Sequence, residues 1–243
     1  MTSRMNLFKV FGTYIALAFM SPGVLGQCTV TNDLRVAAGL FPCGTEVSYQ
    51  GYNYQTVEIG GQCWFAENLR ASQYSNGDAI ANSLSETEWM SASSGASAIY
   101  GEGTEHCGGS FCNETDNENY WGFLYNGYAV LDSRGLCPNG WHVPTIAEFS
   151  QLSSNGGTAL KAASSGIANT SWDGDNSTGF TGLPAGFRNA YNADFNDGGS
   201  YALWWTSTES GDNMRRYVLE SGGAIYTNGM AKGHGYSIRC LKD

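Results

Sequence analysis

Basic residues are scarce in this chain, and they never cluster. Only 12 of the 243 residues are Lys or Arg, against 22 Asp or Glu, and the formal net charge is −10. A protein that binds nucleic acid needs grouped Lys and Arg side chains to neutralise phosphates. The composition therefore excludes nucleic acid as an expected partner.

Charge of either sign is sparse as well. Charged residues make up 14% of the chain, against about 25% in typical domains, which argues against a coiled coil or helical bundle rich in Glu and Lys. Apolar residues reach 42% and aromatic residues 13%, and a disordered chain lacks both. With 33 glycines and only 5 prolines, the composition indicates a glycine-rich globular domain.

The signatures of common enzyme classes are missing too. The chain contains no GxxxxGK[ST], GxSxG or HExxH motif, and Gly101-Glu102-Gly103 lacks the third glycine of a dinucleotide loop. We therefore expect neither enzymatic activity nor a cofactor. The alternative is a secreted glycan-active hydrolase, because the acidic residues are numerous enough to supply a catalytic carboxylate pair.

One apolar run lies near the N-terminus. Arg4 and Lys9 precede an uncharged stretch over 10–20, and Val24-Leu25-Gly26 places a small residue before Gln27. This is the layout of a secretory signal peptide over 1–26, since the run is shorter than the ~20 residues of a membrane span. We expect cleavage before Gln27, which removes Arg4 and Lys9, and no membrane span in the remaining chain.

All seven cysteines follow the predicted signal: Cys28, Cys43, Cys63, Cys107, Cys112, Cys137 and Cys240. Disulfides are the expected state in an oxidising compartment. Zinc is the competing interpretation for His106, Cys107 and Cys112, but no second pair with matching spacing exists. We expect Cys107 to pair with Cys112, and Cys43 to pair with Cys63 across the N-terminal strands, with Cys28 left over.

The residue pattern predicts short helices first and strands later. Residues 45–60 alternate in polarity with a break at Gly51, which indicates two strands or one bulged strand. Capping boxes at Ser85/Glu88 and Thr145/Glu148 predict helices near 87–92 and up to 153. Helical spacing is also seen over 119–131. Strands are expected at 201–208, 216–220, 224–227 and 236–241, which together indicate an α+β domain.

A cluster of oxygen-bearing side chains precedes Gly198-Gly199. Its members are Asn192, Asp194, Asn196 and Asp197. Calcium is the candidate ion for such a loop, although the next glutamate, Glu209, lies twelve residues beyond Asp197. A turn held by Asn and Asp side chains is the alternative, and we favour it.

Aromatic residues stand within the loops predicted over 166–200 and 209–235. The candidate ligand-binding residues are Trp172, Tyr191, Phe195 and Tyr226. Loops on a rigid scaffold often carry binding residues, and flat aromatic rings stack on the apolar faces of sugars. Packing of these rings beneath their own loops is the alternative.

We interpret two of the arginines as structural residues rather than ligand-binding ones. Arg188 and Arg239 stand in apolar surroundings of an acidic chain. We expect them to pair with buried carboxylates such as Glu67 or Glu148 rather than to face a ligand.

Several motifs occur together in a fixed order. They are IGGQCWFAENLR at 59–70, CPNGWHVPT at 137–145, LPAGFR at 183–188, WWTST at 204–208 and SIRC at 237–240. In this combination the chain resembles the Fibrobacter succinogenes major paralogous domain family over residues 43–243, which leaves 27–42 as a lead-in segment.

The resemblance implies an exported protein, secreted or at the cell surface of a Gram-negative bacterium, with a C-type-lectin-like fold. That fold returns its last strand beside the second helix region, which implies a Cys137–Cys240 disulfide. The calcium-and-sugar triplets of true C-type lectins do not occur. We expect a non-catalytic binding or adhesion module for a glycan or a surface protein; a structural component of a surface matrix is a further alternative.

Overall fold

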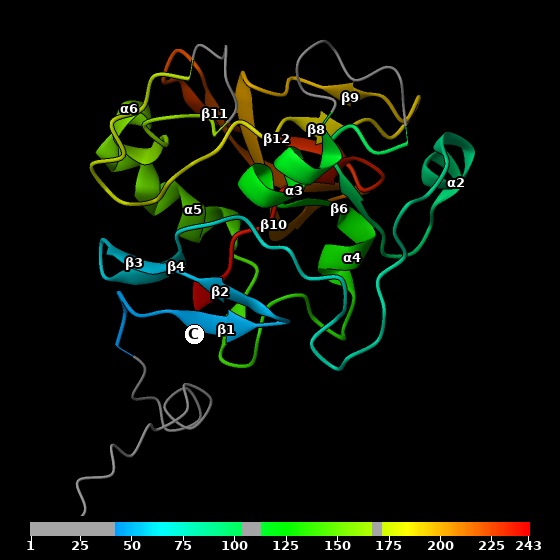
Figure 1. Ribbon diagram of the computed structural model, residues 1–243, viewed down its shortest axis with the longest axis horizontal. Coiled ribbons are helices and arrows are strands. Elements are labelled where there is room, and N and C mark those ends of the chain that lie inside the picture. Colours follow the sequence, from blue (N-terminus) through cyan, green and yellow to red (C-terminus); the bar gives the residue numbers. More distant parts are fainter. Residues whose placement is uncertain (1–41, 104–112, 167–171) are drawn as a thin grey trace, which may run out of the picture. The chain divides into compact units, whose positions relative to one another are not determined.

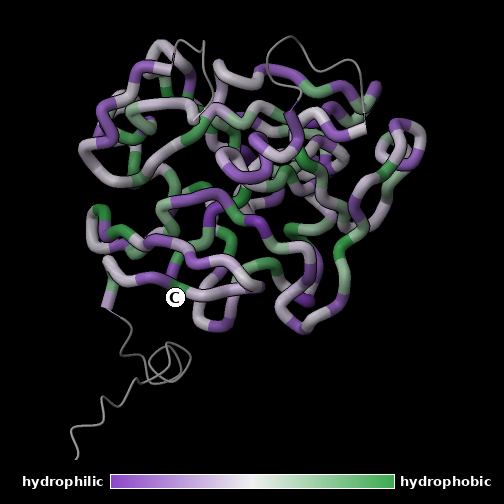
Figure 2. The backbone as a smooth tube through the Cα atoms, viewed as in Figure 1, coloured by the Kyte–Doolittle hydropathy of each residue, from purple (hydrophilic) through white to green (hydrophobic). Residues whose placement is uncertain are grey.

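The computed structural model describes residues 42–103, 113–166 and 172–243 (Figure 1). The predicted signal peptide, the lead-in over 27–41, Cys28 and the Cys107–Cys112 pair lie outside the described residues. Among the described residues, no helix is long and apolar enough to cross a membrane. In Figure 2, apolar stretches alternate with polar ones along this part of the backbone.

Two tight hairpins open the described chain. Strands β1 (Val47–Tyr49) and β2 (Tyr52–Tyr54) pair across Gln50-Gly51, and β3 (Thr56–Ile59) and β4 (Gln62–Phe65) pair across Gly60-Gly61. All four turn residues have positive φ, as a two-residue hairpin turn requires. The predicted break at Gly51 is therefore confirmed as a turn between separate strands.

Short strands from distant parts of the sequence form two further sheets. Strand β14 (Leu241–Lys242) lies between β4 and β7 (Trp141–His142). The five-stranded sheet has the order β5 (Ser97–Ile99), β6 (Phe123–Asn126), β13 (Gly235–Tyr236), β8 (Phe187–Arg188) and β9 (Phe195–Asn196). The predicted strand over 236–241 is thus two short strands that join different sheets.

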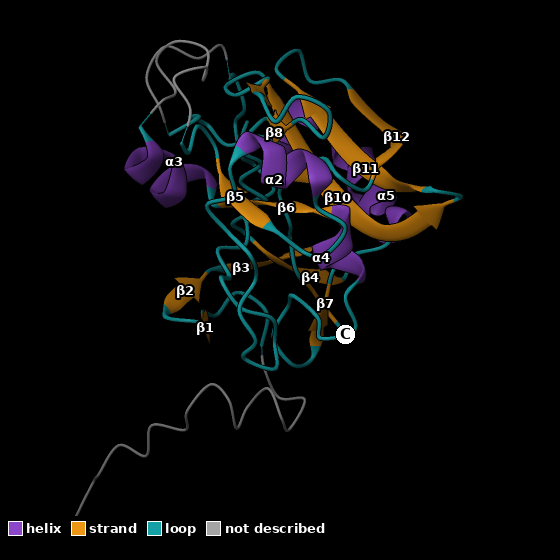
Figure 3. Ribbon diagram, turned by 90° about the vertical axis from the view of Figure 1, so that its right-hand side faces the viewer, coloured by secondary structure: helices purple, strands orange, loops and turns teal. Residues whose placement is uncertain are grey.

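The longest strands form an antiparallel three-stranded sheet. Its order is β10 (Tyr201–Ser210), β11 (Asn213–Glu220) and β12 (Ile225–Ala231), with β12 at one edge (Figure 3). Trp204 pairs with Tyr217, and Phe149 of helix α5 stacks on the Tyr217 ring. Trp205 lies on the opposite face against Tyr236. Both tryptophans are fully buried, so neither is an exposed platform.

Helices are short and begin at side-chain caps. They are α2 (Glu86–Ser91), α3 (Glu114–Trp121), α4 (Gly127–Leu131), α5 (Ile146–Leu152) and α6 (Gly157–Leu160), with a 3₁₀ turn over Ser153–Asn155. Both predicted capping boxes are present, at Ser85/Glu88 and Thr145/Glu148. Reciprocal bonds between cap and third residue satisfy N–H groups that a helix start leaves unpaired.

The predicted helical segment over 119–131 is wrong in its middle. Helix α3 ends at Trp121, strand β6 follows, and α4 begins after Asn126. Gly122 adopts φ 73, where a side chain is unfavourable, and this ends the helix. The side chain of Asn126 then accepts a hydrogen bond from the Ala129 N–H and starts α4. Aromatic spacing alone did not reveal these two boundaries.

Two buried clusters form the core, and disulfides join its edges. Trp64, Trp121 and Trp204 belong to one cluster, whereas the other holds Trp205 together with Cys137 and Cys240. The Cys43–Cys63 and Cys137–Cys240 disulfides are both present, which confirms these two predicted pairs. The α+β class is confirmed as well.

Candidate functional site

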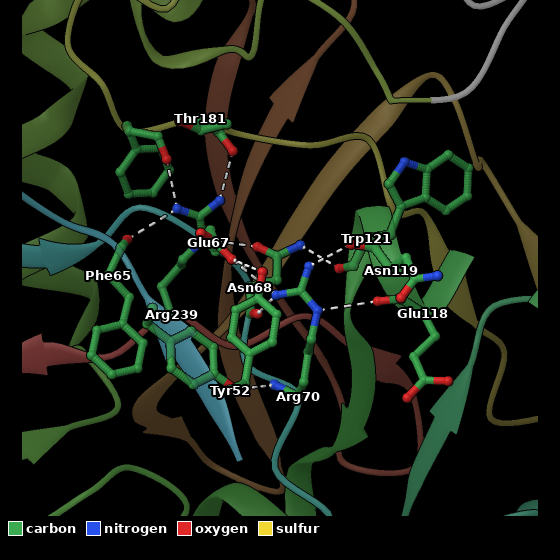
Figure 4. A network of polar contacts seen from close by, with 12 residues as sticks. Tyr52, Phe65, Glu67, Asn68, Arg70, Glu118, Asn119, Trp121, Thr181 and Arg239 are labelled. Carbon is green, nitrogen blue, oxygen red and sulfur yellow. Dashed lines mark hydrogen bonds and ion pairs between the residues drawn. The ribbon is translucent and has the colours of Figure 1, made fainter. Parts of the chain in front are cut away.

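Asn68, from the longest motif, is the centre of a buried polar network (Figure 4). Its amide nitrogen donates to the Trp121 carbonyl at 2.8 Å. Its amide oxygen accepts from the Trp204 indole at 2.9 Å and from Arg239 Nε at 2.8 Å. This side chain therefore ties α3, β10 and the C-terminal segment to the strand β4 region, and has no group left to bind a ligand.

Arg239 is completely buried and bonds carbonyl oxygens. Its guanidinium donates to the main-chain oxygens of Phe65, Phe180 and Thr181 at 3.0, 2.6 and 2.7 Å. Burial lowers its pKa to about 9. The predicted pairing with Glu67 or Glu148 is wrong, because this pocket offers enough carbonyl acceptors to satisfy the cation without a carboxylate.

Arg188 does pair with a carboxylate, but with Glu102. The two groups lie 3.0 Å apart and both are buried. The Arg188 guanidinium also lies over the Trp89 ring at 4.6 Å. Glu67 bonds Arg70 and Glu148 bonds His142 instead, so each of the two predicted partners is engaged by another side chain.

Two of the four predicted ligand-binding aromatics are core residues. Trp172 is 5% exposed and donates its indole N–H to the Gly182 carbonyl; Phe195 is 4% exposed and contacts the Tyr100 ring at 5.2 Å. This burial favours the alternative of core packing for both residues, and Phe195 lies on strand β9 rather than in a loop. Tyr191 and Tyr226 are 74% and 37% exposed and stay candidates.

The predicted cation loop is held by its own side chains. The Asn192 amide donates to the Asp194 carboxylate at 2.6 Å, and the Asn196 amide donates to the Asp194 carbonyl. Within the ranges that the structure describes, no group of three or more His, Cys, Asp or Glu could hold a metal ion. The geometry is that of Asx turns. The Asp197 side chain takes no part in these hydrogen bonds.

A chain of aromatic rings leads from Tyr191 to the three-stranded sheet. The Tyr191 ring meets the edge of His234 at 5.5 Å, and His234 stacks on Tyr236 at 5.8 Å. The Arg216 guanidinium lies 4.9 Å from the centre of the Tyr236 ring. These contacts join a loop before β9 to strands β11 and β13.

Strand register explains why Tyr226 belongs to the same surface. Arg216 pairs with Asn228, and Val218 pairs with both Leu203 and Tyr226. Residues directly opposite each other in a sheet share a face, and so do alternate residues of one strand. We call this surface the Tyr191–Tyr226 face; it comprises Tyr191, Asp197, Tyr201, Arg216, Glu220, Tyr226, Asn228, His234 and Tyr236.

Arg216 is held in place on this face by two hydrogen bonds. Its Nε donates to Asn228 and its Nη1 donates to the Tyr236 hydroxyl, both at 2.6 Å. Its second terminal nitrogen has no hydrogen bond within the described ranges. A planar guanidinium fixed on two sides presents its remaining N–H groups in one direction.

Asp197 supplies an acceptor beside this cation. Burial raises the pKa of its carboxyl, and the charge of Arg216 opposes that rise. The carboxylate makes no hydrogen bond or ion pair with any described residue. Its backbone lies at φ 61, a conformation that costs free energy for a residue other than glycine.

His234 is neutral on this face. Burial and the Arg216 charge lower its pKa to about 4. Its Nδ1 accepts a hydrogen bond from the Ala190 N–H at 3.3 Å, so its Nε2 carries the proton. That buried N–H has no partner in the described part of the chain.

A hollow in another part of the described chain is lined by carboxylates. Glu86, Glu88 and Glu114 surround it, and the Arg188–Glu102 pair lies beside them. Burial raises the pKa of Glu102, as expected for a general acid. However, Glu102 accepts hydrogen bonds from Arg188 and from the Ile99 N–H. These two bonds occupy both carboxylate oxygens, one each, and oppose the rise in pKa that burial causes.

The chain matches the family model described as the Fibrobacter succinogenes major domain over residues 57–242. The chain belongs to this family. No curated protein and no solved structure matches the chain.

The motifs that carry the family resemblance are largely accounted for by folding. Asn68, Arg188, Trp204 and Arg239 hold buried contacts within the family domain. The Tyr191–Tyr226 face lies within the matched residues but mostly outside those motifs. Sequence reasoning missed Arg216, His234 and Tyr236 on this face, because only the strand register brings them beside Tyr191.

Proposed function

We propose that this protein is an exported, non-catalytic binding or adhesion module that acts at the surface of a Gram-negative bacterium or in its secretome. The signal-peptide layout of residues 1–26 supports export. The two disulfides support an oxidising compartment.

The observation that carries the binding proposal is the Tyr191–Tyr226 face. It combines two exposed tyrosines with a fixed arginine, a carboxylate that bonds none of the described residues and a buried imidazole N–H. The polar groups of the Asn68 network bond one another and the main chain, whereas Arg216 Nη2, the Asp197 carboxylate and His234 Nε2 have no hydrogen bond to any residue that the structure describes. Buried or constrained polar groups beside exposed aromatic rings are typical of ligand sites.

We also propose the C-type-lectin-like fold for the domain. Thr145 caps helix α5 directly after Pro144, as the Trp-x-x-Pro-Thr segment of that fold implies. Strand β14 lies beside β7, and Cys137–Cys240 joins the same two regions.

A secreted glycan hydrolase is the second candidate, and the carboxylate-lined hollow is the observation that favours it. Turnover of chromogenic glycosides by the purified protein tests this alternative. We expect none, because the two oxygens of Glu102 are occupied by hydrogen bonds from Arg188 and the Ile99 N–H. Turnover that Glu114→Gln abolishes would favour the hydrolase.

Retention on cells tests the binding proposal. The exported protein, Tyr191→Ala and Tyr226→Ala are incubated with whole bacterial cells and with insoluble polysaccharide, and the bound fraction is measured. Tyr120→Ala is the matched control, because Tyr120 is also exposed but lies on α3. We expect the wild type and Tyr120→Ala to be retained, and both other variants to be retained less. Absence of retention of the wild type would contradict the proposal.

A further inference from the structure

The Tyr191–Tyr226 face combines exposed aromatic rings with polar side chains. It therefore suits a ligand that has both apolar faces and hydroxyl groups. Tyr191 exposes most of its ring, and its neighbours His234 and Tyr236 keep it at the end of a row of packed rings. Tyr226 is the second exposed ring, on the edge strand β12. A tyrosine held in this way offers a flat apolar surface with little entropy left to lose on binding.

The polar groups between these rings pair donors with acceptors. Arg216 retains N–H donors on its second terminal nitrogen, and Asp197 nearby offers two carboxylate oxygens. Arg has only donors and an ionised Asp only acceptors. Adjacent hydroxyls on a ring satisfy both at once, because each hydroxyl donates and accepts. A carboxylate in the ligand, which only accepts, could bond Arg216 but not the ionised Asp197.

Charge selects among hydroxyl-bearing ligands. The face carries the carboxylates of Asp197 and Glu220 against the single cation of Arg216, and His234 stays neutral. The whole chain is acidic, with a net charge of −10. An anionic polymer is therefore repelled both by the face and by the field of the protein.

Resting on the proposed function, we infer that the ligand of this face is a neutral oligosaccharide, which stacks on Tyr191 and Tyr226 while Asp197 and Arg216 bond its ring hydroxyls. Binding needs no metal ion, because the polar contacts come from these two side chains. The two tyrosines contact different sugar units of one chain, so a single monosaccharide engages only one of them.

Affinity electrophoresis through gels that contain soluble polysaccharide tests this inference. The neutral probes are a β-glucan, a xylan and a mannan, and the acidic probes are polygalacturonate and alginate; each is run with and without a chelator. We expect at least one neutral probe to retard the full protein, chelator to have no effect, and acidic probes to cause no retardation.

Variants place the binding on this face. Asp197→Gly removes the carboxylate and relieves the positive φ, so the protein folds at least as well and its retardation falls about tenfold, as expected for one lost charged hydrogen bond. Tyr191→Ala has a similar effect, and Tyr120→Ala has none. Unchanged retardation of Asp197→Gly and Tyr191→Ala would overturn the inference.

Other outcomes separate the two proposals. Retention on cells without retardation by any neutral probe, or retardation by acidic probes, overturns the neutral oligosaccharide while the binding module stands. Absence of binding to every probe and to cells overturns both.

Discussion

At the scale of single residues, buried polar groups divide into those that folding satisfies and those that it does not. Arg239 and Asn68 bond each other and several main-chain carbonyls. His234 Nε2 is buried without a partner among the described residues, and the carboxylate of the exposed Asp197 makes no hydrogen bond to them. Buried groups without a partner cost free energy. On this face His234 Nε2 is such a group, and Gln62, Trp64, Tyr74 and Trp89 carry others elsewhere in the described ranges, so it is the exposed tyrosines beside Arg216 and Asp197 that indicate a site here.

Replacing Arg239 tests whether its buried hydrogen bonds stabilise the fold. Arg239→Met leaves the carbonyls of Phe65, Phe180 and Thr181 without their donor, and we expect a loss of about 3–5 kcal/mol in the free energy of unfolding. Arg215→Met is the matched control; Arg215 is half-buried and donates to Thr227, so its loss is about 1 kcal/mol or less. Urea denaturation measures both losses. Equal losses would contradict a special role of Arg239 in stabilising the fold.

At the scale of elements, local signals predicted helix starts better than strand partners. Both capping boxes lie where the sequence places them, because a cap depends on residues three apart. Within the predicted 119–131 helix, strand β6 is extended because it pairs with β5 and β13. Such partners are far away in the sequence, so the aromatic spacing gave no sign of them.

The cap of α5 also gives a pH-dependent prediction. Burial would raise the pKa of Glu148, but hydrogen bonds from Thr145 and the neighbouring His142 outweigh it, and the pKa falls below its ordinary value of 4.5. A carboxyl with a lowered pKa stabilises the fold above its unfolded-state pKa, and this stability is lost as the pH falls through the folded-state pKa.

Glu148→Gln should therefore reduce the loss of stability below about pH 4.5, while glutamine keeps the capping hydrogen bond at higher pH. Melting temperature against pH measures the effect. Glu58→Gln, at an exposed position of β3, is the control and should leave the acid limb of the curve unchanged. An acid limb that Glu148→Gln does not alter would show that the cap does not respond to pH.

At the scale of the whole molecule, the class and the two disulfides were predictable, whereas the site was predictable only in part. Tyr191 and Tyr226 were identified from composition, but Trp172 and Phe195 are buried. A loop rich in Gly and Asn does not reveal which of its aromatics turns inward. Arg216 joins the face only through the register of β11 and β12, which no local pattern reveals.

The two disulfides should differ in their effect on stability. Cys137–Cys240 spans 103 residues and Cys43–Cys63 spans 20, and restricting the longer loop removes more entropy from the unfolded chain. Chain-entropy estimates are about 5 and about 3 kcal/mol. We therefore expect the double variant Cys137→Ala/Cys240→Ala to melt at a lower temperature than Cys43→Ala/Cys63→Ala. The reverse order would contradict the entropic account.

The most direct test of the binding site is hydrogen–deuterium exchange of the full protein with and without a retained neutral polysaccharide fragment. A ligand on the Tyr191–Tyr226 face slows exchange in the segments 189–201 and 225–236, which carry its loop and edge strand. The segments 83–103 and 113–118 around the carboxylate-lined hollow stay unchanged. Slower exchange at the hollow, with none at the Tyr191–Tyr226 face, would contradict the account.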